Sequence, residues 1–110
     1  MNRLEIKDLT VEKYENLIER VKTDRSSILL LEETQGDKCL YCEKYSKNYC
    51  DKCPLKDEKE GIKYLKKKKI DPLGSVHCCG GRWLAMRKSI NTTNELQSLK
   101  NLLAYIKKHG

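Results

Sequence analysis

The sequence predicts a small, mostly α-helical domain that is stapled by a metal ion, and three observations favour this class. The chain has 110 residues, of which 38% are hydrophobic and 35% charged, so a single domain (1–110) with a modest core is expected. Two stretches, one near each end, carry apolar residues at helical spacing. Between them lie six cysteines, and small domains often add a covalent or metal staple to a core of this size.

The first predicted element is an N-terminal helical region, residues 10–34. Thr10 is expected to cap a helix that covers residues 10–23. The aliphatic run at 28–31 fits either a short strand or a second helix, because four residues are too few for periodicity to separate the two. The amphipathic character of the helix comes from an apolar stripe at Val11, Tyr14, Leu17, Ile18 and Val21.

A cysteine-rich region, residues 39–81, follows and contains a doubled C-x-x-C pattern. The two pairs are separated by seven residues, and zinc favours four such thiolates in a tetrahedron. Lysines interleave with the cysteines, and nearby positive charge stabilises thiolates. We therefore predict one zinc site in a zinc-knuckle-like cysteine block. The candidate metal ligands are Cys39, Cys42, Cys50, Cys53, His77, Cys78 and Cys79.

The choice of four ligands among these seven candidates stays open in the sequence. Either the doubled C-x-x-C pattern supplies all four, or one or both pairs combine with Cys78 or Cys79. An iron–sulfur cluster is the alternative cofactor, because sets of four cysteines also hold such clusters. A thiol redox protein is a further alternative, although no βαβ unit of the thioredoxin kind is visible.

The chain between the second C-x-x-C pair and the C-terminal helix offers short candidate elements. Pro54 suits the first turn of a short helix that Gly61 would end. Residues 62–69 fit a strand or a helix, which leaves room for a short β hairpin. Gly80 and Gly81 are expected to form a flexible point, and residues 82–90 contain good helix formers.

The clearest element is a C-terminal helix over residues 92–108. Thr92 and Glu95 have the spacing of a capping box at its start. One face carries an apolar stripe at Leu96, Leu99, Leu102, Leu103 and Ile106. We therefore expect the N- and C-terminal amphipathic helices to pack around the cysteine block.

Two features of the sequence bear on location. The first twenty residues are charged throughout and lack the apolar core of a secretory signal, and the longest aliphatic run is far too short to cross a membrane. We therefore expect a cytoplasmic protein with no membrane partner, in a compartment where disulfides are rare.

The order of motifs along the chain resembles a known group of proteins. The motifs are "LTVEKYENLIERV", then "CLYCEKY", "CDKCPL" and "CCGGRW", and finally a Leu-rich helix. In this layout the chain is similar to small cysteine-rich proteins encoded by tailed phages and mobile elements. The resemblance implies a phage-like context and a metal-stapled helical fold, and it implies no reaction.

The charge is distributed unevenly along the chain. Residues 1–60 hold 12 Lys/Arg against 14 Asp/Glu, whereas residues 61–110 hold 11 against 2. The C-terminal half is therefore expected to bind an anionic partner, either nucleic acid or an acidic protein surface. Its candidate binding residues are Lys63, Tyr64, Lys66, Lys67, Lys68, Lys69, Arg82, Trp83, Arg87 and Lys88. The aromatic residues among them could stack on bases, although Trp83 also fits a role as a core anchor.

No catalytic constellation is visible, so we do not expect an enzyme. A phosphate-binding glycine loop, an H-E-x-x-H helix and a zinc-deaminase signature are all absent from the sequence. The leading functional hypothesis is nucleic-acid binding through the basic C-terminal half. The alternative is a protein-interaction module that inhibits a host enzyme or an immunity complex, an anti-defence role.

Overall fold

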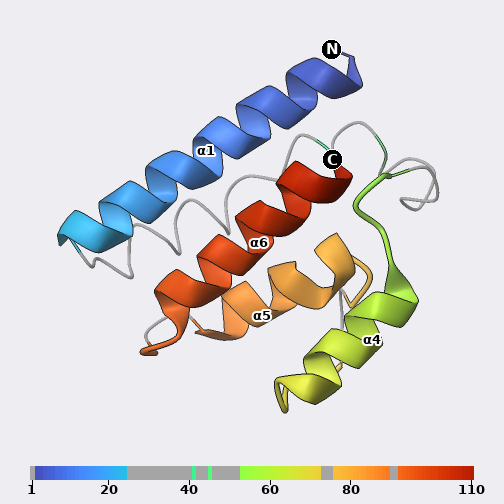
Figure 1. Ribbon diagram of the computed structural model, residues 1–110. Coiled ribbons are helices and arrows are strands. Elements are labelled where there is room, and N and C mark those ends of the chain that lie inside the picture. The colour runs from blue at the N-terminus through green and yellow to red at the C-terminus, as the bar shows by residue number, and fades with distance from the viewer. Residues whose placement is uncertain (1, 25–40, 42–44, 46–52, 73–75, 90–91) are drawn as a thin grey trace.

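The described part of the chain folds almost wholly into helices. The computed structural model describes residues 2–24, 41, 45, 53–72, 76–89 and 92–110. Helix α1 spans Arg3–Asp24, α4 spans Glu58–Lys67, α5 spans Arg82–Ser89 and α6 spans Glu95–His109, and a short 3₁₀ turn, η2, spans Cys79–Gly81 (Figure 1). The mostly α-helical class predicted from the sequence is confirmed.

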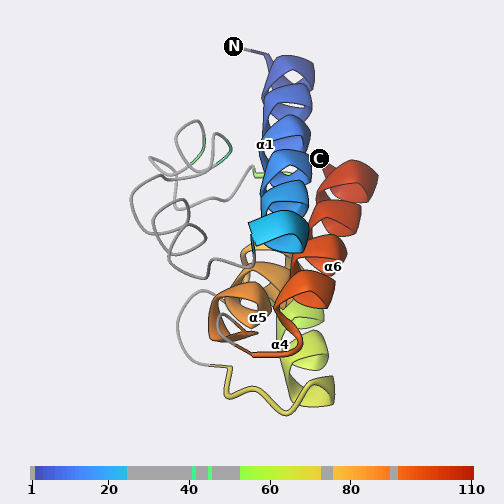
Figure 2. The same ribbon diagram turned by 90° about the vertical axis from the view of Figure 1, so that its left-hand side faces the viewer.

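The two terminal helices pack against each other along their length, as both views show (Figures 1 and 2). Helix α5 contacts the other side of α6, and α4 packs against η2 and α5. Both predicted apolar stripes lie on the packed faces of these helices, because their side chains are buried or half-buried. The main core contains Leu17, Ile18, Tyr41, Leu99, Leu102 and Ile106 among others.

Helix α1 begins earlier than the sequence predicted. The predicted cap, Thr10, is buried inside the helix, where its hydroxyl donates a hydrogen bond of 2.7 Å to the carbonyl oxygen of Ile6. The first turn is capped instead by Asn2, whose side-chain oxygen accepts from the backbone N–H of Glu5 at 2.9 Å. The prediction was wrong because threonine can satisfy its hydroxyl within a helix as well as at its start. Residues 25–34 of the predicted helical region lie outside the described residues.

Helix α6 also begins differently from the prediction. The hydroxyl of Thr92 donates to the carbonyl oxygen of Ser89 at 2.6 Å and accepts from the backbone N–H of Asn94 at 3.2 Å. This hydroxyl therefore closes the turn after α5, and the predicted capping box does not form. Asn94 immediately precedes the helix. Glu95 is the first residue of the helix, and its side chain is buried. Its Oε1 atom has no hydrogen-bond partner among the described residues.

Helix α4 replaces the short helix that was predicted from Pro54 to Glu60. Asp57 is the cap, because its carboxylate accepts from the backbone N–H of Glu60 at 3.0 Å. The helix then continues through Gly61 to Lys67, so the predictions of a helix start at Pro54 and a helix end at Gly61 were wrong. Residues 62–69, which fitted a strand or a helix, are helical as far as Lys67.

Glycines bring α4 and η2 into backbone contact. A Cβ atom on Gly61 would clash with the carbonyl oxygen of Val76, and one on Gly81 would lie 2.8 Å from the carbonyl oxygen of Gly61. Cys79, Gly80 and Gly81 have φ values of 51°, 53° and 80°, in the left-handed region that favours glycine. The predicted flexible point at Gly80 and Gly81 is therefore a tightly packed turn, in which both glycines are buried.

Sheet pairing in the described ranges is limited to an isolated antiparallel bridge between Lys56 and Cys78. The short β hairpin for which the sequence left room is therefore not found among residues 53–72 and 76–89. The helix formers noted in residues 82–90 form helix α5 as far as Ser89, and residue 90 lies outside the described residues. None of the helices described has the length and apolar character that crossing a bilayer requires.

Candidate functional site

The cysteine-rich region is described only in part. Cys39, Cys42 and Cys50 lie outside the described residues, whereas Cys53, Cys78 and Cys79 lie within them. The backbone N–H of Asp57 donates to the carbonyl oxygen of His77 at 2.9 Å, and Lys56 forms its bridge with Cys78. The chain that leaves the second C-x-x-C pair therefore runs beside the segment that carries the later cysteines.

The described thiols differ in their surroundings. Cys79 is buried in the main core, and half-buried Cys53 packs against that core. Cys78 and His77 are also half-buried. Within the ranges that the structure describes, no three His, Cys, Asp or Glu side chains gather closely enough to hold a metal ion. The seven predicted ligands therefore remain a prediction, since half of the cysteines lie outside these ranges.

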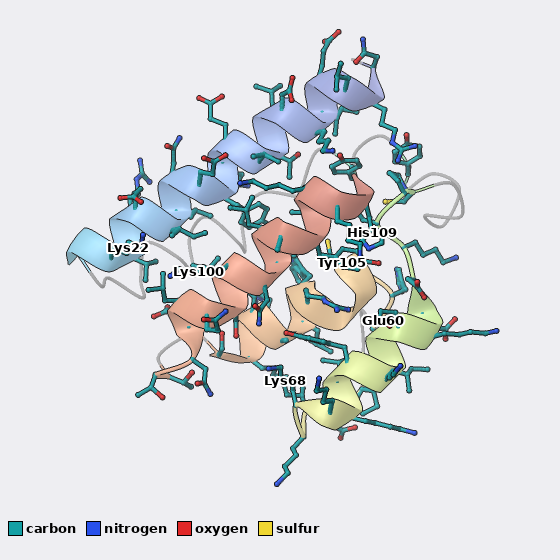
Figure 3. The ribbon with its side chains drawn as sticks, in the orientation of Figure 1. Lys22, Glu60, Lys68, Lys100, Tyr105 and His109 are labelled. Carbon is teal, nitrogen blue, oxygen red and sulfur yellow. The ribbon has the colours of Figure 1, made fainter. Side chains whose placement is uncertain are left out.

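Four of the predicted binding residues, Tyr64, Lys68, Arg82 and Lys88, line a groove between α4 and α6. The two helices form its walls, and Arg82 and Ala85 of α5 line it from below. It contains two hollows of about 530 and 280 Å³, both lined by Tyr64 from α4 and Asn101 from α6. In Figure 3, Lys68 marks one end of the groove, and Glu60, Tyr105 and His109 surround the other.

The smaller hollow is basic. Lys68 follows α4, Lys88 lies near the end of α5, and both line this hollow. The remaining lining is neutral, because the described residues around it include no Asp or Glu. Its amide side chains come from the segment that leads into α6 and from α6 itself, at Asn94, Gln97 and Asn101.

Exposed lysines continue the positive charge of this hollow along α4 and the turn after it. The spacing of α4 buries Leu65 and leaves the lysines on the outer side of the helix. The turn that follows places Lys69 at φ 59°, so the chain reverses while its lysines stay exposed. The exposed residues of this group are Lys63, Lys66, Lys67, Lys68 and Lys69.

The larger hollow is built around Arg82. Its Nη1 atom donates to the carbonyl oxygen of Gly80 at 2.7 Å and to a carboxylate oxygen of Glu60 at 3.0 Å. The guanidinium carbon lies 4.0 Å from the ring centre of Tyr64 and 4.9 Å from that of Tyr105. Two acceptors and two aromatic rings therefore hold this arginine in place, and its charge is largely balanced within the protein.

A chain of polar contacts joins the two walls of the groove. The side-chain nitrogen of Asn101 donates to the hydroxyl of Tyr64 at 3.2 Å, and that of Gln97 donates to the side-chain oxygen of Asn101 at 2.9 Å. With Arg82 against its ring, Tyr64 is held by both its hydroxyl and its ring. Tyr64, one of the two aromatic residues that the sequence analysis proposed for base stacking, is therefore fixed in the middle of the groove.

Tyr105 is the titratable group whose pKa is perturbed in the larger hollow. Tyr105 is buried, and this burial raises the pKa of its phenol above the usual value of 10.0. The carboxylate of Asp57 raises the pKa further, whereas the guanidinium of Arg82 acts in the opposite direction. Burial and the carboxylate of Asp57 therefore both favour the neutral form of the phenol.

The other two candidates from α5 lie away from this groove. Trp83 is half-buried and packs against the main core, as the core-anchor interpretation expected. The guanidinium carbon of Arg87 lies 5.6 Å from the centre of the Trp83 ring. Neither residue lines either hollow of the groove.

The groove also contains residues that the sequence did not single out. Asn101 and Gln97 lie on the polar side of a helix whose apolar stripe drew the prediction, and isolated amides on such a face resemble ordinary solvated residues. Asp57, Glu60 and Tyr105 line the larger hollow only because α4 and α6 meet there in space. Their spacing in the sequence carries no signal of that contact.

In comparisons with protein-family models, curated proteins and solved structures, no match to this chain was found. Its function is therefore inferred from the groove and from the segments that carry the cysteines.

Proposed function

We propose that this protein binds nucleic acid through the basic hollow and the exposed lysines of α4. The observation that carries the proposal is the convergence of Lys68 and Lys88, from two different elements, on a hollow with no Asp or Glu in its described lining. Four further exposed lysines continue the positive charge along α4 and its C-terminal turn. Such a surface matches a row of phosphates better than a single small anion.

The lysines and the arginines have different roles in this proposal. The α4 lysines are exposed and can move to meet phosphates, and each neutralised phosphate releases counterions. Arg82 is held by Glu60 and by two tyrosine rings, so it positions Tyr64 and does not serve as a phosphate contact. The phosphate contacts are therefore assigned to Lys63, Lys66, Lys67, Lys68, Lys69 and Lys88.

The test is the salt dependence of affinity for a labelled oligonucleotide, measured by fluorescence anisotropy. Replacing Lys68 and Lys88 by Glu should weaken binding by about 100-fold or more at low salt and flatten the plot of log Kd against log salt. The matched control replaces Lys100 and Lys107 by Glu, because these exposed lysines of α6 lie outside both hollows. The control makes the same change in net charge and should weaken binding much less.

Equal losses in the two double variants would show that only net charge matters, which contradicts a defined site. No affinity for DNA or RNA in the unmodified protein would overturn nucleic-acid binding altogether. The acidic surface of a partner protein, as an inhibitor of a host enzyme or immunity complex would use, would then be the remaining partner of this basic face.

We also propose that the cysteine-rich region holds one zinc ion with a structural role. Two observations support ligands from both parts of that region: the bridge between Lys56 and Cys78, and the hydrogen bond from Asp57 to His77. They bring the chain after Cys53 beside the chain that carries Cys78. A closed thiolate site would add a staple to a small core in a reducing compartment such as the cytoplasm.

Metal analysis by native mass spectrometry tests this staple on protein purified without added metal. One zinc per chain is expected, and a chelator should then reduce the helical circular-dichroism signal, because metal-binding energy is folding energy in such domains. Iron with sulfide, or a disulfide-linked chain without metal, would contradict the zinc proposal. Those results would favour an iron–sulfur or thiol redox protein.

A further inference from the structure

We infer that the groove between α4 and α6 receives a single nucleic-acid strand and excludes a duplex. This inference rests on the proposed function and specifies its substrate class. It assigns the exposed lysines to the phosphates and the two hollows to bases that lie on either side of the Tyr64–Asn101 contact.

The width of the groove favours a single strand over a duplex. The hydrogen bond of 3.2 Å between Asn101 and Tyr64 joins the two walls directly. A duplex is far wider than a gap that two side chains can span, so it could touch the rims of this groove but could not enter it. The hollows of about 530 and 280 Å³ on either side of the contact have the size of small-molecule sites. Each has room for one base.

The aromatic ring of Tyr64 is held in a fixed position, which favours stacking on a base. Tyr64 is fixed by Asn101 at its hydroxyl and by Arg82 at its ring, so little freedom remains for it to lose on binding. The ammonium of Lys68 lies 5.7 Å from the centre of the same ring, on an exposed side chain. This lysine can turn to a phosphate and leave the ring to a base. Aromatic side chains in grooves for single strands stack on bases in this way, largely without regard to sequence.

The chemistry of the basic hollow also favours a single strand. Its amide side chains offer both donors and acceptors, and the bond from Gln97 to Asn101 leaves the oxygen of Gln97 for other partners. Base edges with donors and acceptors of their own are accessible in a single strand. In a duplex the Watson–Crick edges are paired and the remaining edges lie within the DNA or RNA grooves. A duplex that is too wide to enter this hollow cannot bring those edges to its amides. Lysines alone would bind the phosphates of a duplex as well as those of a single strand. The amides are therefore the groups that distinguish the two substrates.

The experiment compares a labelled 12-nucleotide single strand with its blunt duplex, for DNA and for RNA, by fluorescence anisotropy at one salt concentration. The single strand is expected to bind about tenfold more tightly or better. Replacing Tyr64 by Leu should remove most of this preference and leave the lysine-driven salt dependence in place. Replacing Tyr64 by Phe keeps the ring and should change affinity by less than about threefold, because only the hydroxyl contact is lost.

A second variant keeps the test decisive if Y64L does not fold. Replacing Gln97 by Ala removes an exposed amide from the hollow and should weaken single-strand binding several-fold without changing duplex binding. The matched control is Asn16→Ala, an exposed amide on α1 that lies outside the groove. Circular-dichroism melting verifies that each variant retains its fold.

The outcomes separate the inference from the function on which it rests. Tighter single-strand binding that Y64L or Q97A abolishes supports both. Equal affinities for the two substrates, with no effect of Y64L or Q97A, would overturn the single-strand groove and leave nucleic-acid binding through the lysines intact. Absence of binding to every oligonucleotide would overturn the function and the inference together.

Discussion

The contact between α1 and α6 and the contact between α4 and η2 are both closely packed, but they are built in opposite ways. Large aliphatic side chains fill the first, with Leu99 and Leu102 fully buried. The second depends on missing side chains, because Gly61 and Gly81 let two backbones meet. The first contact is therefore weakened when atoms are removed, and the second when atoms are added.

The difference matters for the groove, because the two contacts support its two walls. Helix α6 is fixed by its apolar stripe against α1, whereas α4 is fixed by its glycine against η2. Across the groove, the side chain of Asn101 in α6 donates a hydrogen bond to the hydroxyl of Tyr64 in α4. The width of the groove therefore depends on two packing contacts that respond to different substitutions.

The largest effect is expected from Leu99→Ala. This side chain is fully buried, so its truncation removes apolar contacts and leaves a cavity that costs about 2–5 kcal/mol of unfolding free energy. Urea denaturation followed by circular dichroism measures the loss. Leu4→Ala is the matched control, because Leu4 is 67% exposed and should change stability by less than about 0.5 kcal/mol. Similar losses in both variants would contradict the assignment of the core.

A smaller loss, of about 1–3 kcal/mol, is expected from Gly61→Ala. Alanine normally stabilises a helix interior by about 1 kcal/mol relative to glycine, so this substitution should act against the helix propensity. The reason is that the new Cβ atom would meet the carbonyl oxygen of Val76. The same denaturation experiment measures it, with Lys63→Ala at an exposed position of α4 as the control. A gain in stability for G61A would show that α4 does not approach η2 as described.

The smallest effect is a pH dependence from Tyr105. Because burial raises the pKa of its phenol in the folded protein, its contribution to stability is fully present below pH 10.0, the usual tyrosine value. That contribution is lost as pH rises above this value and through the raised pKa of the folded state. Unfolding free energy should therefore fall less steeply with alkaline pH in Tyr105→Phe than in the unmodified protein. Parallel curves for the two proteins would contradict the raised pKa.

Some of this fold could be predicted from the sequence because it follows from periodicity. The stripes of α1 and α6, together with the helix formers of α5, describe which residues share one face of a helix, and that depends on local spacing alone. The caps were harder to predict. Thr10 and Thr92 each make a hydrogen bond other than the predicted capping contact, and local sequence does not decide between these uses.

Gly61 shows why α4 was misread. Glycine disfavours helices in general, but here the helix continues because η2 requires the space that a side chain would fill. The residues of the candidate site also divide into those that local sequence points to and those that only packing brings there. Charge and residue type in the sequence singled out the lysines and Tyr64 as candidates, whereas Asn101 and Gln97 line the groove only because α6 lies opposite α4.

The central proposal is that nucleic acid binds in the basic hollow between α4 and α6. A titration of the ¹⁵N-labelled protein with a single-stranded oligonucleotide, followed by backbone NMR shifts, tests this claim directly. Binding in this hollow should change the shifts around Lys68, Lys88 and Asn101 and leave those of the exposed face of α1 unchanged. Changes centred on α1, or none at saturating oligonucleotide, would contradict it.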